Sequence, residues 1–167
     1  MTFIPLYVQD LQLGAPGAFF TAYALALLAV QVSAGRMSDR VGRAQVATPT
    51  TALAGVFILL LALVRTTWLG WGAAFLYGLA AGAARVAIDG MVADSVPAHQ
   101  RATAVALQFT CFDLWIGLGS ALLGPLAQAA GYPAMYAIAG MLSIAGAIPF
   151  ARLARASSPV VLPSIRA

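Results

Sequence analysis

Charged residues are scarce in this chain of 167 residues, which has no lysine and no glutamate. Only 8% of the residues are charged, 62% are hydrophobic, and the mean hydropathy is +0.90. A soluble domain carries roughly 25% charged residues, so this chain has too little charge to cover a surface in water. The composition excludes an ordinary soluble domain and predicts an integral membrane protein whose main solvent is the lipid bilayer.

Cysteine and histidine each occur once, as Cys111 and His99. One cysteine excludes an intramolecular disulfide, and its apolar surroundings disfavour a thiolate metal site. His99 stands in a polar stretch and is interpreted as a solvated loop residue. The sequence contains no P-loop, no GxSxG and no Cys/His metal spacing, and no basic run interleaved with aromatic residues in a polar context. We therefore expect no enzyme, no cofactor, no metal and no nucleic-acid partner.

Long apolar runs, by contrast, are abundant. Five are long enough to cross the roughly 30 Å hydrocarbon core as helices, and the alternation of a β-barrel is missing. They cover residues 15–34, 44–64, 68–88, 102–130 and 134–152. The opening MTFIPLYV is too short to span and is interpreted as the end of a helix, whereas Gly131 and Pro133 predict a break between the last two helices.

The expected fold class is therefore all-α: a polytopic membrane helix bundle with about five full transmembrane helices and an N-terminal partial helix. We expect one transmembrane domain over residues 1–154. The last residues, 155–167, contain two prolines and no helical period, and they predict a disordered cytosolic tail.

The arginines indicate how the helices are oriented. If residues 35–43 are cytosolic, Arg65 is the one arginine outside, and Arg85 lies within a helix. The other seven then fall on the cytosolic side: Arg36, Arg40, Arg43, Arg101, Arg152, Arg155 and Arg166. An excess of arginine marks cytosolic loops, so the pattern predicts a cytosolic C-terminus.

Residues 35–43, GRMSDRVGR, concentrate three of the nine arginines between two apolar segments. Gly35 and Gly42 are expected to bracket a tight turn between antiparallel helices, because glycine adopts positive φ at little cost. Asp39 can accept hydrogen bonds from the free N–H groups of a nearby helix N-terminus. The arginines alone would fit an ordinary positive-inside loop, but the ordered set G-x-M-S-D-R-x-G-R favours a specific motif.

This ordered set resembles the signature loop of the major facilitator superfamily (MFS), which recurs after the second and the eighth helix of those twelve-helix transporters. The matching positions are Gly35, Met37, Asp39, Arg40, Gly42 and Arg43. Ala44 departs from the family, which often has a further basic residue there. Residues 3–25 and 94–132 resemble the passages from the seventh to the eighth helix and from the tenth to the eleventh. The resemblance implies the C-terminal half of such a transporter, from a truncated seventh helix through the twelfth.

The resemblance also implies a role for the loop. In the family, its aspartate and final arginine form a charge relay with an acidic residue of a neighbouring helix, and the relay latches the two halves in the outward-facing state. Here the relay would consist of Asp39, Arg43 and Asp94, with Arg101 as a further partner. It would be a conformational latch and not a substrate site.

Asp113 lies about eleven residues into the segment 102–130, roughly 16 Å along a helix and near the bilayer midplane. A charge there costs on the order of 2.5–3.5 kcal/mol. On a helical wheel Asp113 shares a small, polar face with Phe109 and Ser120. One interpretation is that this face lines a central cavity, in which Asp113 binds a proton or a cation. The other is that Asp113 is a helix-contact residue satisfied by its neighbours.

Arg85 and Asp89 stand four residues apart and therefore share a helix face. The pair is interpreted either as part of the substrate or proton pathway or as a snorkelling arginine with a local partner.

The predicted function is transport of a small molecule by a secondary carrier; the resemblance implies frequent proton coupling and efflux. We expect a multi-pass protein of a bacterial inner (plasma) membrane. Since the resemblance covers one half, an N-terminal half is expected as a partner, in the same longer chain or as a separate chain. The alternative is a truncated membrane fragment that does not transport, or a membrane interaction partner.

Overall fold

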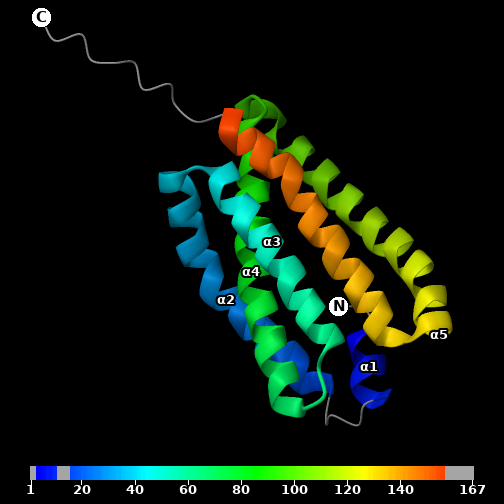
Figure 1. Ribbon diagram of the computed structural model, residues 1–167. Helices are drawn as coiled ribbons and strands as arrows, with labels where there is room; N and C mark the ends of the chain where they lie inside the picture. The colour runs from blue at the N-terminus through cyan, green and yellow to red at the C-terminus, as the bar shows by residue number, and fades with distance from the viewer. Residues whose placement is uncertain (1–2, 11–15, 157–167) are drawn as a thin grey trace, which may run out of the picture.

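A computed structural model describes residues 3–10 and 16–156, and within these ranges the regular elements are helices only. They are α1 (Ile4–Asp10), α2 (Pro16–Val41), α3 (Arg43–Ala62), α4 (Thr67–Asp94), the short 3-10 helix η1 (Ala98–Gln100) and α5 (Arg101–Ala156) (Figure 1). The all-α expectation is confirmed. The predicted tail lies outside the described residues from 157 onward, and Arg155 and Ala156 still belong to α5.

The 56-residue α5 is two helices in one element, because Gly131 has non-helical angles of φ 82° and ψ 163°. The chain doubles back there, as the yellow end of α5 shows in Figure 1. We call residues 101–130 the first arm and residues 132–156 the second arm. The break predicted at Gly131 is confirmed, and its cause is local: a positive φ is cheap only for glycine.

The described chain is long and apolar enough to cross a membrane several times. Arg43–Ala62, Thr67–Asp94 and Ala98–Arg155 each qualify, and α2 makes a fourth span if its parts Gly17–Gln31 and Ser33–Val41, bent by 46°, count as one. Each arm of α5 has the roughly 20 residues that one crossing needs. The protein is therefore a multi-pass membrane helix bundle.

Small residues hold the tightest helix contacts, as is usual where lipid removes the hydrophobic drive between helices. A Cβ atom added at Gly78 of α4 would lie 2.7 Å from the carbonyl oxygen of Tyr23 on α2. One added at Gly55 of α3 would lie 2.8 Å from the carbonyl oxygen of Gly140 in the second arm. Backbone therefore meets backbone between α2 and α4 and between α3 and the second arm.

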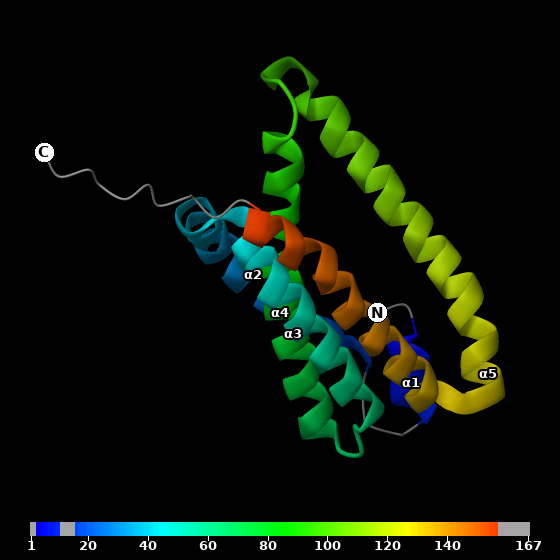
Figure 2. The same ribbon diagram turned by 45° about the horizontal axis from the view of Figure 1, so that its top comes forward.

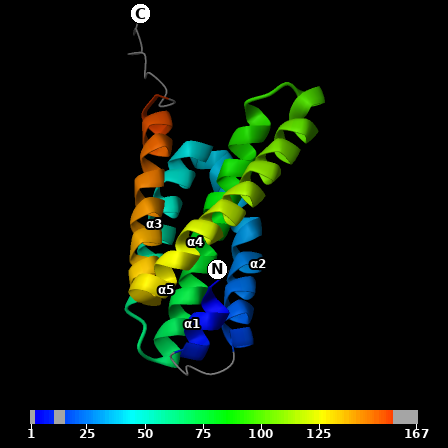
Figure 3. The same cartoon turned by 90° about the vertical axis from the view of Figure 1, so that its right-hand side faces the viewer.

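The first arm stands apart from this packed group, inclined away from it in Figures 2 and 3. Residues 111–118 are all exposed, although most of them are apolar. The end of the first arm near Gly131 returns to the main core, where Ala127 joins a cluster with residues from α1, α2, α3, α4 and the second arm. That buried cluster contains Tyr7, Val8, Phe19, Leu61, Val64, Ala73, Ala74, Ala127, Met135 and Tyr136.

The predicted loop 35–43 is corrected by the structure, because α2 continues through it to Val41. The helical hydrogen bonds run on to the end, where the Gly42 amide donates to the Ser38 carbonyl at 3.1 Å. The turn is reduced to Gly42 alone, at φ 112°. Gly35 is no turn residue: it lies inside the helix, where an added Cβ would be 3.9 Å from Val86 of α4.

The end of α4 also differs from the prediction. The helix runs past residue 88 to Asp94, whose carboxylate therefore projects from the last helical turn and not from a loop. The sequence has no proline from residue 67 to residue 96, so no proline ends α4 before Asp94.

Candidate functional sites: an arginine bridge and a polar cavity

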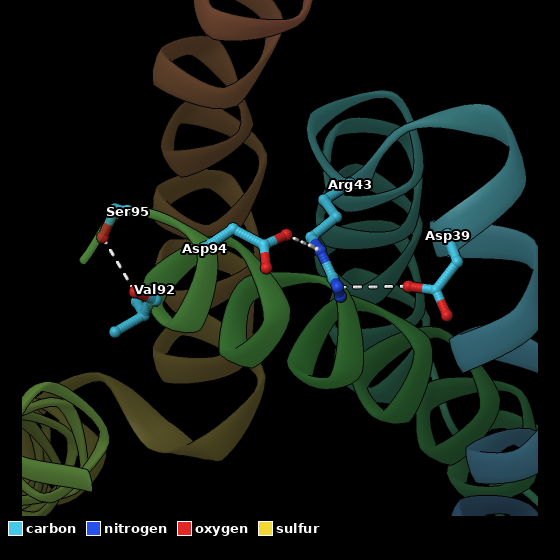
Figure 4. A network of polar contacts seen from close by, with 5 residues as sticks. All are labelled: Asp39, Arg43, Val92, Asp94 and Ser95. Carbon is cyan, nitrogen blue, oxygen red and sulfur yellow. Dashed lines mark hydrogen bonds and ion pairs between the residues drawn. The ribbon is translucent and has the colours of Figure 1, made fainter. Parts of the chain in front are cut away.

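Arg43, the first residue of α3, links three helices at one end of the bundle. Its Nη2 lies 3.1 Å from Oδ1 of Asp39 on α2, and its Nε donates a hydrogen bond to Oδ2 of Asp94 on α4. Figure 4 shows the guanidinium between the two carboxylates. The single positive φ of Gly42 turns the chain so that Arg43 follows directly beside the end of α2. We call Asp39, Arg43 and Asp94 the arginine bridge.

The bridge is partly open to solvent: the side chain of Arg43 is 28% exposed, and those of Asp39 and Asp94 are 61% and 55% exposed. Ion pairs at such exposure contribute little to stability, about 0.2–1 kcal/mol. Two carboxylates share one guanidinium, so the cluster carries a net charge of −1. These ion pairs can therefore break and re-form at a small cost in free energy, and they add little to the stability of the folded bundle.

The other predicted members of the motif do not join this bridge. Arg40 and Arg101 are exposed, and neither makes an ion pair within residues 3–10 and 16–156. Gly35 lies within α2, as described above. The structure therefore brings together Asp39, Arg43 and Asp94, with Gly42 as the turn that places them.

Gly90 of α4 is a residue that the sequence analysis missed. A Cβ atom there would overlap the Arg43 guanidinium and would lie 2.9 Å from Cδ of Arg43. The absence of a side chain at Gly90 lets Arg43 cross α4 to reach Asp94. A signal was present, since Gly90 precedes Asp94 by four residues and so shares its helix face.

A second polar group surrounds Arg85 on α4. Its guanidinium carbon lies 5.0 Å and 4.9 Å from the ring centroids of Phe109 and Phe112 in the first arm. Its Nε is 3.9 Å from Oδ2 of Asp89, while Oδ1 of Asp89 accepts a hydrogen bond from Nε2 of Gln108 at 2.6 Å. Arg85 and Asp89 thus form the expected i,i+4 pair, and both reach toward the first arm.

These residues line a cavity of about 550 Å³ between α2, α3, α4 and the first arm. Its remaining wall includes Tyr23, Leu27, Gln31, Thr51, Ala54, Tyr77, Ala81, Ala84 and Ile88. We call it the Arg85 cavity. The sequence analysis did not predict three residues of this lining: Phe112, Gln108 and Thr51. A glutamine within an apolar helix is itself a signal of a buried polar contact.

The predicted common face of Phe109, Asp113 and Ser120 does not form one site. Phe109 lines the Arg85 cavity, whereas Ser120 lines a separate cavity of about 200 Å³. Asp113 lies in an open groove of the first arm with Thr110, Leu114, Gly117 and Leu118. The face that meets the bundle is centred on Phe112 and Ile116, so Asp113 stands on its flank.

Within the described residues, no group of three or more His, Cys, Asp or Glu side chains is placed to hold a metal ion.

The fold is that of a multi-pass, all-α membrane protein with an arginine bridge at one end of its helix bundle. The sequence model of the Major Facilitator Superfamily matches residues 1–166. The chain therefore belongs to the Major Facilitator Superfamily.

A similar curated protein is the "Staphylopine export protein" of Staphylococcus aureus (strain Mu50 / ATCC 700699), 27% identical over 147 residues. The match covers 86% of this chain and 37% of that protein, so the chain spans little more than a third of its relative. No solved structure matches the chain.

Proposed function

We propose that this chain is the C-terminal half of a secondary carrier that moves a small molecule across a bacterial inner membrane. Carriers of this type bind substrate between two helical halves and expose it to alternate sides by rocking them. Membership of the superfamily and the multi-pass fold support the proposal. The similar protein of Staphylococcus aureus is named as an export protein, which favours efflux as the direction.

The observation that carries the proposal is the arginine bridge. Asp39 and Arg43 come from the motif that resembles the signature loop of the family, and Asp94 comes from a neighbouring helix. The three residues meet at the end of the bundle that the arginine pattern assigns to the cytosol. We propose that this bridge is the latch of the outward-facing state.

The latch is tested by Asp39→Asn in the complete membrane protein. Removing one carboxylate weakens an exposed ion pair by about 0.2–1 kcal/mol, so the ratio of outward- to inward-facing molecules should fall by up to about fivefold. Cysteine accessibility labelling from each side measures that ratio. Arg65→Gln, in the loop between α3 and α4, is the control and should leave the ratio unchanged; an unchanged ratio in Asp39→Asn would contradict the latch.

The first arm supports the proposal of a partner half. Each of residues 111–118 is exposed, and Asp113, on the flank of the face that meets the bundle, carries a charge that is costly to leave facing lipid. A second half lying against this arm would enclose Asp113 between the two halves. There Asp113 would bind the proton that couples transport, while Arg85, Asp89, Phe109 and Ser120 line the pathway.

The mass of the membrane product separates this proposal from the alternative of a fragment that does not transport. A tag at the C-terminus, introduced at the native locus, reports it directly. A band of about twice 17.2 kDa or more would place this chain within a complete carrier. A band near 17.2 kDa would demand a separately encoded partner, and its absence from affinity-purified membranes would favour the fragment.

A further inference from the structure

We infer that the Arg85 cavity binds small molecules through a carboxylate group that pairs with the Arg85 guanidinium. The inference rests on the proposed function, because it names the substrate class of that pathway. The contacts of Arg85 leave its hydrogen-bond donors available.

Two phenyl rings hold the guanidinium in place without using its donors. Phe109 and Phe112 attract it electrostatically through their ring faces at 5.0 Å and 4.9 Å. The N–H groups of arginine lie in the guanidinium plane and match the two oxygens of a carboxylate. A guanidinium oriented by aromatic rings is therefore prepared for a bidentate partner and loses little freedom on binding one.

The neighbouring carboxylate does not fill that role. The Nε of Arg85 is 3.9 Å from Oδ2 of Asp89, beyond hydrogen-bond distance. The other oxygen of Asp89 is held by Gln108 at 2.6 Å. Within the described residues Arg85 makes no hydrogen bond, and its side chain is 45% exposed where it lines the cavity.

Two further groups of the cavity lack a partner within the described part of the chain. Oγ1 of Thr51 and Oε1 of Gln108 are buried and form no hydrogen bond. A buried polar atom without a partner costs about 1–3 kcal/mol. Both atoms are buried, so a ligand reaches them only when a neighbouring side chain of the wall moves aside. The Thr51 hydroxyl can then donate to a carboxylate, and Oε1 of Gln108 can accept from a hydroxyl or amine elsewhere on the same ligand.

The remaining wall determines what kind of carboxylate fits. The stacked rings of Tyr23 and Tyr77, 5.8 Å apart, and the two phenylalanines surround the polar groups with aromatic surface. Ligand pockets of about 300–1,000 Å³ hold small organic molecules, and this cavity has about 550 Å³. The expected ligand is an organic carboxylate with an apolar or aromatic body.

The test compares 1-naphthoate with 1-naphthamide, which share size and shape and differ in charge. Equilibrium dialysis against the purified full chain in detergent measures both dissociation constants at neutral pH. We expect naphthoate to bind about tenfold more tightly than naphthamide. Arg85→Met should remove that preference, and Arg85→Lys, which keeps the charge and loses the planar fork, should reduce it several-fold.

Arg65→Met is the matched control, an arginine outside the cavity whose loss should leave both constants unchanged. Size-exclusion chromatography checks that each variant is folded, and Arg85→Lys decides the outcome if Arg85→Met is not. Naphthoate binding no tighter than naphthamide, or a preference that survives the loss of Arg85, would overturn the inference. If the complete protein transports a neutral substrate as well as its carboxylate analogue, carboxylate recognition by Arg85 is overturned and the proposed transport function stands. If binding depends on Arg85 but the complete protein transports nothing, the proposed transport function is overturned and carboxylate recognition stands.

Discussion

The two arms of α5 are both apolar helices, yet they have opposite surroundings. In the second arm Met135, Tyr136 and Ala147 are buried against α3 and the core, whereas residues 111–118 of the first arm are exposed. The glycines show the same contrast. Gly140 meets the backbone of Gly55, while Gly117 has nothing within 4 Å of its Cβ position. Close helix contact therefore depends on which small residues face each other, and apolar character by itself does not produce it.

The largest expected effect comes from a substitution where the second arm packs closely against α3. Gly55→Ala places a methyl group 2.8 Å from the Gly140 oxygen and the Ile144 nitrogen, which are backbone atoms that cannot give way. Such overpacking costs about 1–3 kcal/mol. Thermal inactivation of the detergent-solubilised chain, followed by size exclusion, should show a lower midpoint.

Gly117→Ala is the matched change in the first arm. It meets no atom within 4 Å, and alanine favours a helix over glycine by up to about 1 kcal/mol. The midpoint should stay the same or rise. Equal losses for the two variants would show that the two arms are packed alike.

An intermediate effect is expected at Gly90, where an added Cβ atom would meet the side chain of Arg43 and not a backbone. Gly90→Ala displaces Arg43 from Asp94, so the conformational ratio should shift in the direction of Asp39→Asn, by up to about fivefold. The stability should change little, because the gain in helix propensity offsets the lost ion pair. Gly72→Ala in the same helix, with nothing within 4 Å, is the control; an equal shift there would exclude the steric explanation.

The smallest effect on stability is expected at Asp113, on the exposed arm. Asp113→Asn should not lower the stability of this chain, because asparagine stays polar and removes a charge that is costly to leave facing lipid. In the complete protein the same change should abolish transport driven by a pH gradient, because asparagine cannot release a proton. Undiminished transport by Asp113→Asn vesicles would remove the proposed coupling role.

Several features were predictable because their causes are local. The break at Gly131 follows from a glycine followed closely by a proline, and the all-α membrane class follows from composition and apolar run length. The residues of the arginine bridge were named from a resemblance of motif, and the structure brings those three side chains together. Their role as a latch stays a prediction.

Other features were predicted wrongly because the cause lies in a neighbouring helix. Gly35 is interpreted from the sequence as a turn residue, but it faces Val86 across the contact between α2 and α4. A glycine that turns a chain and a glycine that admits a neighbour have the same letter in the sequence. Only the packing of α2 on α4 distinguishes them.

The sequence by itself determined that this protein lies in lipid, that its fold is helical and that the chain reverses with positive φ at Gly42 and Gly131. Each of these depends on composition or on the backbone of one residue. The tertiary structure decided which face of the first arm meets the bundle, and so placed Phe109 and Phe112 over Arg85 and left Asp113 on the flank. The physical reason is that the apolar residues of a helix in lipid need not gather on one side. Contacts with its neighbours therefore set its rotation, and the positions of its apolar residues do not.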